Sequence, residues 1–337
     1  MHAASFSVSS DPAPGRACPL RYHHGPVALA DAPEQKAKTL YVIGGLYGNL
    51  PALATLRQLA ALEVGSVTLC FNGDFNWFNV DDIGFVAINQ FVLGHDACLG
   101  NVEAELLAAD EEAGCGCAYP DSVDGATVER SNHIHQRLKR TAQGHPQLLR
   151  RLAALPMVRR YRIGDAAIGV VHGDAESLAG WRFDAAALDD PDNCAWIEAA
   201  FRAAQVDVFA SSHTCLPALR AFDHNRRRVI NNGAAGMPNL RGKRFGIVTR
   251  IGVAPAPTPA LYGSTLNDIH VDALALEYDS VAWEREFLAN WPPESPAHVS
   301  YFRRIVTGPD HGLTEATADQ FRTSQTPSEC ERDAAEP

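Results

Sequence analysis

The sequence predicts a layered α/β fold, in which buried strands alternate with helices. Short apolar runs with β-branched residues recur along the chain, each followed by a loop and then by a helical pattern. Residues 38–43 lead into leucines at helix spacing in 51–62, and residues 67–71 lead into the amphipathic stretch 85–93. With 46% hydrophobic and 20% charged residues among 337, such a chain buries roughly 75% of its unfolded surface.

The same alternation continues beyond these two units. A helical pattern covers 100–113 and the charged stretch 126–155, and strand character returns in 166–171, 206–210, 228–230 and 245–251. Pro255, Pro257 and Pro259 exclude a central strand, so we expect a loop between two strands there.

We expect one central domain, 38–252, flanked by less regular segments. Residues 1–37 and 312–337 show no helix or strand period and are predicted to be tails, at least partly disordered. The helical insertion at 113–155 is long enough to fold over a site. Residues 253–311 carry several aromatic side chains and are predicted to pack on the core as a C-terminal extension.

The composition argues against three classes of protein: nucleic-acid-binding proteins, membrane-spanning proteins and disulfide scaffolds. The formal net charge of −11, from 29 Lys plus Arg against 40 Asp plus Glu, argues against nucleic-acid binding, which needs a basic face. No apolar run approaches the roughly 18 residues that span a bilayer, and the start has no apolar signal core, so we expect a cytoplasmic protein with no membrane partner. Eight cysteines are too few for a disulfide scaffold. The sequence does not indicate an oligomeric state.

Polar residues lie at five junctions between a predicted strand and the loop that follows it. The junctions are 44–49 (GGLYGN), 73–74 (GD), 100–103 (GNVE), 171–174 (VHGD) and 212–215 (SHTC). Side chains at the strand ends of an open sheet gather where ligands bind. Taken singly, each junction is equally typical of a turn or of a buried histidine. Aromatic residues at 75–78 and 181–183 fit a pocket wall and core packing equally well.

In their order, the junctions resemble the motifs of the calcineurin-like metallophosphoesterase superfamily. Those motifs are Asp-x-His, Gly-Asp, Gly-Asn-His-Asp/Glu, a lone His, and Gly-His-x-His. Residues 231–238 (NNGAAGMP) are similar to the stretch that follows the last motif in bacterial members, and the resemblance covers roughly 38–250. It implies a four-layer α-β-β-α sandwich with a helical insertion, and a metal centre that hydrolyses a small phosphorylated substrate.

The sequence departs from these motifs at one of the family's two metal positions. Gly45 and Tyr47 replace the Asp and His of the first motif, and Cys215 replaces the last His. Of the ligands that the resemblance implies for this position, only Asp74 is retained. Val102 replaces the third-motif His, which in the family acts on the leaving group, so we expect weak activity toward ordinary phosphomonoesters.

The other metal position retains all four ligands that the resemblance implies. They are Asp74, Asn101, His172 and His213. Two imidazoles, a carboxylate and an amide oxygen suit Mn, Fe or Zn, with positions left for water or a phosphate oxygen. Since the losses fall on one position only, we expect a modified site with one transition metal that activates water, and no second ion.

Other groups near these motifs are candidates for supporting roles. A compensating acid could be His95, Glu103 or Asp174, although the two carboxylates are equally typical of a helix N-terminus or a turn. A second set, Cys215, Cys115 and Cys117, could rebuild the vacated metal position and would favour Zn or Fe, while buried inert thiols are the usual case.

Phosphate binding needs further donors. The candidates are Asn49, Asn231, Asn232 and Arg241. The favoured function is a metal-dependent phosphoesterase. The alternatives are a non-hydrolytic protein of the same fold that binds a phosphorylated ligand or partner, and a cysteine-modified metal site with other chemistry.

Overall fold

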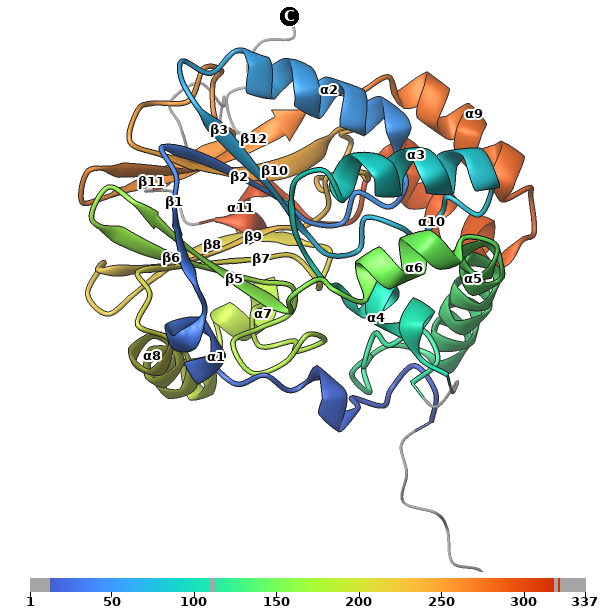
Figure 1. Ribbon diagram of the computed structural model, residues 1–337, viewed down its shortest axis with the longest axis horizontal. Helices are drawn as coiled ribbons and strands as arrows, with labels where there is room; N and C mark the ends of the chain where they lie inside the picture. Colours follow the sequence, from blue (N-terminus) through green and yellow to red (C-terminus); the bar gives the residue numbers. More distant parts are fainter. Residues whose placement is uncertain (1–12, 110–112, 318–320, 322–337) are drawn as a thin grey trace, which may run out of the picture.

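A computed structural model describes residues 13–109, 113–317 and 321. The described residues form two six-stranded sheets that lie face to face, with helices on the outer face of each (Figure 1). This four-layer α-β-β-α sandwich confirms the fold class expected from the sequence.

The first sheet combines a parallel half with an antiparallel half. Its strands, in spatial order, are β11 (Tyr262–Leu266), β12 (Ile269–Leu276), β10 (Gly246–Gly252), β2 (Thr39–Ile43), β3 (Val67–Asn72) and β4 (Asp96–Cys98). Strands β2, β3 and β4 are parallel, whereas β10 runs antiparallel to both β2 and β12. The loops after β2, β3 and β4 therefore leave the sheet at the same edge.

The second sheet has a comparable edge. Its spatial order is β1 (Glu34–Lys36), β5 (Val158–Ile163), β6 (Ala166–Val171), β7 (Val208–Ser211), β9 (Arg227–Asn232) and β8 (Pro217–Phe222). Strands β6, β7 and β9 are parallel, so the residues that follow them emerge together.

Successive side chains along a strand point to opposite faces of the sheet, so they pack in different layers of the core. In β2, Leu40 and Val42 pack between the sheets, where Ile168 and Val170 of β6 meet them. Tyr41, the residue between Leu40 and Val42, points to the opposite face and packs under the outer helices. Both faces of this sheet are covered, so every residue of β2 is buried, and its side chains are apolar or aromatic from Leu40 to Ile43.

Helices cover the sandwich on both sides and at one end. The outer face of the first sheet carries α2 (Leu50–Ala61), α3 (Asp82–Val92) and α9 (Ser280–Asn290), and the second sheet carries α1 (Val27–Asp31), α7 (Ala185–Leu188) and α8 (Pro191–Ala204). At the end of the sandwich lie α4 (Asn101–Leu107), α5 (Gly125–Gln143), α6 (Pro146–Leu152) and α10 (Pro296–Thr307) (Figure 1). None of the helices in the described part of the chain is long and apolar enough to span a membrane.

The N-terminal segment is not the tail that the sequence predicted. Residues 13–37 are folded. They contain a 3₁₀ turn at Leu20–Tyr22, helix α1 and strand β1, which pairs with β5. Tyr22 and Leu29 are buried, and these isolated apolar anchors leave no periodic signal in the sequence. Residues 1–12 lie outside the described residues.

The C-terminal boundaries also differ from the prediction. Strands β11 and β12 complete the first sheet, so part of 253–311 belongs to the central domain, and the Pro-rich loop is an excursion between β10 and β11. Beyond residue 311, a short helix α11 (Leu313–Ala316) packs on β8, and Thr317 pairs with Leu219. The rest of the predicted tail, except Phe321, lies outside the described residues.

A buried ion pair joins the first sheet to the end of α2. The Arg250 guanidinium, fully buried in β10, donates to both carboxylate oxygens of Glu63 at 2.6 and 3.0 Å. The Tyr41 hydroxyl donates to the same carboxylate at 2.8 Å, and Asp272 lies 3.6 Å from the guanidinium. The charge of Arg250 lowers the pKa of Glu63 against the opposing effect of its burial.

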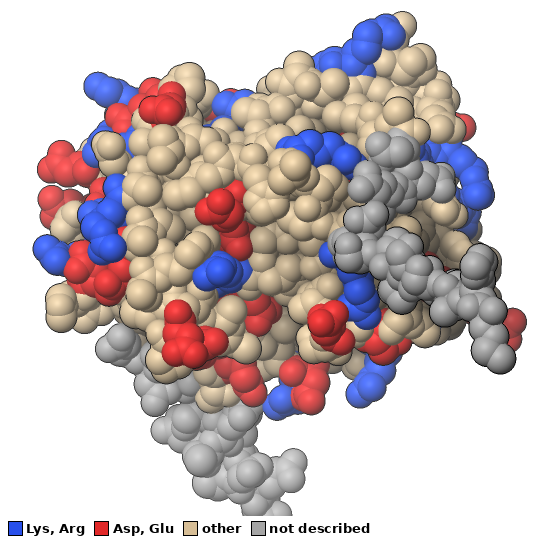
Figure 2. Space-filling model, turned by 90° about the horizontal axis from the view of Figure 1, so that it is seen from below, with Lys and Arg blue, Asp and Glu red and all other residues tan. Residues whose placement is uncertain are grey.

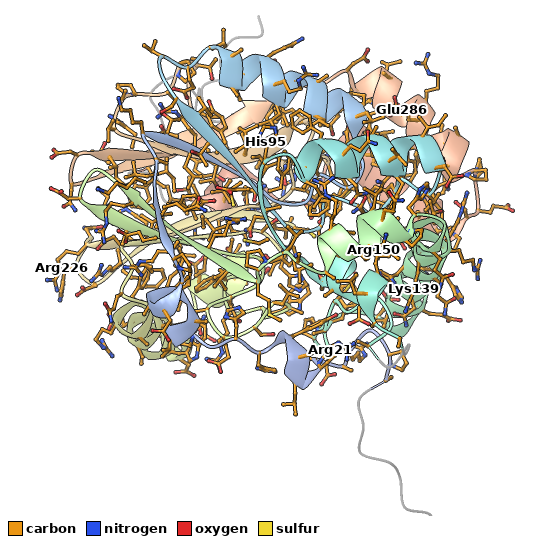
Figure 3. All side chains as sticks on the ribbon, in the orientation of Figure 1. Arg21, His95, Lys139, Arg150, Arg226 and Glu286 are labelled. Carbon is orange, nitrogen blue, oxygen red and sulfur yellow. The ribbon has the colours of Figure 1, made fainter. Side chains whose placement is uncertain are left out.

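Exposed charges are arranged differently. On the face seen in Figure 2, Lys and Arg side chains lie interspersed with Asp and Glu side chains. Arg226 lies at the edge of the molecule (Figure 3) and pairs with Asp223 at 2.7 Å, with 71% of its side chain exposed.

These two pairs predict a contrast in stability. Replacing Arg250 by Ala leaves the Glu63 carboxylate buried without its cation, so the free energy of unfolding should fall by about 3–5 kcal/mol. The Arg226→Ala control should cost less than about 1 kcal/mol. Urea unfolding followed by circular dichroism measures both, and equal losses would contradict the role given to the buried pair.

Candidate metal centre

Four polar side chains meet where the parallel strands of both sheets end. Asp74 follows β3, and Asn101 opens α4 just after β4. His172 follows β6 and His213 follows β7 in the other sheet. The fold therefore brings together residues that are up to 139 positions apart in the sequence, counted from Asp74 to His213.

The ligand atoms of this group lie close to one another. One atom each of Asp74, His172 and His213 lie within 4.8 Å of the others, and all three residues are buried. His172 Nε2 lies 3.3 Å from Asp74 Oδ1 and 3.1 Å from Asn101 Oδ1. The four side chains that the sequence suggested as ligands thus surround one point.

The tautomer of His172 is set by the backbone. Its Nδ1 lies 2.8 Å from the carbonyl oxygen of Asn72 and donates a proton there. That leaves Nε2 facing the oxygens of Asp74 and Asn101, and two acceptors around a ring nitrogen need a proton or a cation between them. A metal ion satisfies all three atoms.

His213 presents the second ring nitrogen. Its Nε2 lies 3.1 Å from the carbonyl oxygen of Cys117 and donates to it. Its Nδ1 is buried and has no hydrogen-bond partner among the described residues. A buried acceptor without a partner is costly, so the donor set fits a metal ion that this nitrogen would bind.

The charges in the site are consistent with this arrangement. Burial opposes ionisation of Asp74, but the neighbouring His172 lowers the pKa of the carboxyl below its ordinary value. Burial disfavours the charged form of His172, yet Asp74 raises its pKa. Burial, together with the charge of His172, lowers the pKa of His213 to about 3, so His213 is neutral at physiological pH.

Glu103 holds the Asp74 loop in place. Its Oε2 accepts from the Asp74 backbone N–H at 2.8 Å, and its Oε1 accepts from that of Asn76 at 3.1 Å. Burial and the Asp74 charge raise the pKa of Glu103 to about 7. Asp74 has a positive φ of 52°, and the carboxylate of Glu103 stabilises this uncommon conformation. Both Glu103 oxygens face the backbone of the loop, as expected of a helix N-terminal carboxylate.

The other two candidate acids are not placed to act on a substrate. The Asp174 carboxylate accepts backbone N–H groups of Glu176, Ser177 and Arg182, so it shapes its own turn. His95 is exposed and its ring lies 4.7 Å from that of Phe91, at the start of β4 (Figure 3). His95 precedes strand β4, whereas the site residue Asn101 follows it. The length of the extended strand therefore separates the His95 side chain from the site.

The predicted phosphate-binding amides are used by the fold instead. Asn49 caps α2 through the N–H of Ala52 and donates to the Gly236 carbonyl. The amides of Asn231 and Asn232 also donate to backbone carbonyls, and both residues are buried. These three predictions were wrong, because each amide satisfies the backbone of a neighbouring turn or strand.

Arg241 was a wrong prediction as well. It lies at the surface and pairs with Asp310 at 2.6 Å, with 56% of its side chain exposed. Its position beyond the last motif suggested a phosphate ligand, but the chain carries it out of the site.

Tyr47 and Cys215, which replace two of the ligands that the resemblance implies for the other metal position, lie against each other. The Tyr47 hydroxyl lies 2.8 Å from Cys215 Sγ. Gly45 has a φ of +64°, and a Cβ there would meet the Tyr47 ring at 3.1 Å. A side chain at position 45 would therefore crowd the Tyr47 ring, so the loss of the first-motif Asp and the presence of Tyr47 belong together.

The structure does not bring the three cysteines together as ligands. Within the described residues, the group of metal-ligating atoms contains Asp74, His172 and His213 and none of the sulfurs. The Cys215 sulfur is hydrogen-bonded to the Tyr47 hydroxyl, and Cys115 is buried in the inserted segment beside Cys117. The carbonyl of Cys117 accepts from His213 Nε2 at 3.1 Å, and its sulfur accepts from the Asn101 amide nitrogen at 3.6 Å.

A cavity of about 40 Å³ opens beside these groups. Five of its lining residues are aromatic, namely Tyr47, Trp77, Tyr119, Trp181 and Tyr301. Of these, Tyr119 and Tyr301 were not singled out in the sequence, since they come from the insertion and from α10, far from any motif. Among the described residues that line the cavity there is no Lys or Arg.

Comparison with known proteins supports the fold. No protein-family model matches the chain, and no curated protein does. A metallophosphoesterase from Sphaerobacter thermophilus is similar over 81% of this chain and 100% of its own, with a TM-score of 0.53 and 16% identity. A hypothetical protein from Pyrococcus horikoshii OT3 is similar over 81% of this chain and 99% of its own, with a TM-score of 0.53 and 17% identity. The chain has the calcineurin-like metallophosphoesterase fold.

Proposed function

We propose that this protein is a metal-dependent phosphoesterase with a single metal ion. The observation that carries the proposal is the buried Nδ1 of His213, which has no partner among the described residues, in a side chain that lies in one group with His172 and Asp74. Asn101 would complete the set through its amide oxygen, because its amide nitrogen already donates to the carbonyl of Cys115 at 3.1 Å.

A divalent ion held there supplies Lewis acidity toward a phosphoryl oxygen and toward a water molecule. The chain orients the ligands for it. The Val102 N–H donates to Asp74 Oδ1 at 3.2 Å, and backbone carbonyls orient both imidazoles. Such surrounding contacts strengthen a metal site and hold it in one geometry.

The cavity favours a phosphodiester over a monoester. A divalent ion and the Asp74 carboxylate together carry one net positive charge, and the cavity walls add no Lys or Arg within the described part of the chain. One positive charge complements the single negative charge of a diester better than the two of a monoester. At about 40 Å³ the cavity admits the reacting phosphoryl group, while the rest of the substrate stays at the mouth.

A second candidate is a non-hydrolytic protein that binds a phosphorylated ligand. Two observations favour it. Val102 offers no proton to a leaving group, and Tyr47 with Cys215 fills the second metal position. The two candidates differ in turnover, since a binding protein would gain thermal stability from ligand without releasing product.

Metal content tests the proposed centre. Protein purified without chelators, or reconstituted with Mn, Fe or Zn, should hold about one equivalent of metal. His213→Ala removes the unpartnered nitrogen and should abolish most of that binding, while His133→Ala, at an exposed position on α5, should leave it unchanged. Elemental analysis measures both variants, and equal metal content would contradict the site.

Turnover tests the reaction. The metal-loaded protein should hydrolyse bis(p-nitrophenyl) phosphate faster than p-nitrophenyl phosphate, and His213→Ala should lose this activity by at least about 100-fold. One bound metal with thermal stabilisation by ligand and no turnover would instead favour the binding protein.

The pH dependence of metal binding follows from the two imidazoles. Because the pKa of His172 is raised above 6.5, the metal-free protein carries a proton there in mildly acidic solution, and metal binding must displace it. His213, with a pKa of about 3, contributes no proton. Metal affinity should therefore weaken as the pH falls through the raised pKa of His172.

Calorimetry in buffers of different ionisation enthalpy measures this effect. Binding at about pH 6 should release about one proton, and binding at about pH 9 should release almost none. Release of two protons at the lower pH would show that both imidazoles were charged and would contradict the assignment.

A further inference from the structure

We propose that the aromatic side chains around the cavity bind a planar, uncharged aromatic group of the substrate, so that the substrate is a phosphodiester with an aromatic group on one ester oxygen. This inference rests on the proposed function, because the metal centre would hold the phosphoryl group. It adds the chemical class of the group beyond the phosphorus atom and the residues that select it.

Three of the five aromatic residues that line the cavity lie at its mouth. Tyr119, Trp181 and Tyr301 are half-buried and form what we call the aromatic rim. The other two, Tyr47 and Trp77, are only 4% and 3% exposed and lie deeper. A substrate whose phosphoryl group reaches the metal ligands therefore places its neighbouring atoms against the aromatic rim.

The rings of the aromatic rim are held in place by their own contacts. The centroid of the Trp181 ring lies 5.4 Å from that of His213 and 6.0 Å from that of Tyr119. The Tyr301 ring packs edge-on against Phe78, with the centroids 5.1 Å apart. Rings that are fixed before a ligand binds lose little conformational entropy on binding, so the rim is preorganised for stacking.

Two polar atoms of the aromatic rim are already paired within the protein. The Trp181 indole N–H donates to the Cys117 carbonyl at 3.0 Å, and the Tyr119 hydroxyl oxygen lies 3.1 Å from that of Ser131. These atoms need no partner from a ligand. The two residues therefore offer ring carbons to a ligand, and contact with an aromatic ring is the interaction that they favour.

The charges around the cavity favour an uncharged ring. Since no Lys or Arg lines it within the described part of the chain, a second phosphate group of the substrate would find no cation there. A cationic group would also be attracted to aromatic faces, but it would lie next to the net positive charge of the metal centre. A neutral aromatic ring meets neither obstacle.

A second and larger cavity, of about 350 Å³, gives such a ring room. Trp181 lines this outer cavity as well as the inner one. The outer lining also includes the carboxylates of Asp190 and Asp192 and the guanidinium of Arg182, which lies 4.6 Å from the Trp196 ring. Two carboxylates beside one guanidinium disfavour an anionic group. A neutral ring can therefore lie against Trp181 while the inner cavity holds the phosphoryl group.

Binding of two phosphinates to the metal-loaded protein tests the aromatic rim. Benzyl(methyl)phosphinate carries an aromatic ring, and (cyclohexylmethyl)methylphosphinate carries a saturated ring in the same place. Both have a single negative charge, and neither has an ester bond that could be hydrolysed. Stacking should make the aromatic ligand bind about 3- to 10-fold more tightly, whereas burial of apolar surface alone would favour the saturated ligand. Isothermal titration calorimetry measures both affinities.

Matched variants show whether the aromatic rim causes the preference. Tyr119→Leu and Tyr301→Leu each remove one ring and should reduce the preference for the aromatic ligand by at least about 2-fold. Tyr119→Phe keeps the ring and should keep the preference. Phe302→Leu, at the next residue of α10 and outside the cavity lining, is the control for Tyr301→Leu. Elemental analysis of each variant shows that the metal content is unchanged.

Three results would overturn the inference: no binding of either ligand, binding of the saturated ligand at least as tight as that of the aromatic one, or an unchanged preference in both leucine variants. Because the phosphinates are not hydrolysed, these results are independent of turnover. Turnover of bis(p-nitrophenyl) phosphate without an aromatic preference would support the hydrolase and refute the role of the rim. An aromatic preference without turnover would support the rim and refute the hydrolase.

Discussion

Two hydrogen bonds between the ends of β3 and β6 set the geometry on which the site depends. The Asn72 amide donates to the carbonyl of Val171 at 2.7 Å, and His172 Nδ1 donates to the carbonyl of Asn72 at 2.8 Å. Each bond joins one sheet to the other, so the sheets cannot slide at this edge without breaking both. The glycine that follows Asn72 allows this approach, because a Cβ on Gly73 would lie 2.6 Å from His172 Nδ1. The Asp74 carboxylate then reaches the opposite ring nitrogen.

Backbone carbonyls orient both imidazoles of the site. Asn72 orients His172, whose Nε2 then faces the oxygens of Asp74 and Asn101, and Cys117 orients His213, whose Nδ1 is left without a hydrogen-bond partner among the described residues. The Cys117 carbonyl also accepts from the Trp181 indole at 3.0 Å. It belongs to the segment inserted between β4 and β5. The inserted segment therefore fixes the orientation of two side chains of the site, the imidazole of His213 and the indole of Trp181.

That the candidate ligand side chains gather at one edge of the sandwich was predictable for a topological reason. Residues that directly follow parallel strands emerge at one edge, so their position in the sequence almost determines their position in space. The role of an amide is not determined in this way. Asn101 and Asn231 both stand beside predicted strand ends, yet Asn101 faces the site whereas Asn231 donates to the Phe183 carbonyl. Which carbonyl lies nearby depends on loop conformations that residue type does not encode. The wall residue Tyr301 comes from α10, which carries no motif at all.

The replacements at Gly45, Tyr47 and Cys215 are structurally connected. Removing the first-motif carboxylate leaves Gly45, whose positive φ and missing Cβ make room for an aromatic ring at the next but one residue. The ring needs a partner for its buried hydroxyl. Cys215 provides it, standing where an imidazole would otherwise bind a metal. Independent loss of ligands would leave a polar cavity open to water. Here the replacements fill the space and satisfy each other, while Asp74 remains available to the retained position. Tyr47 and Cys215 therefore form a packed pair of side chains beside the group of Asp74, His172 and His213.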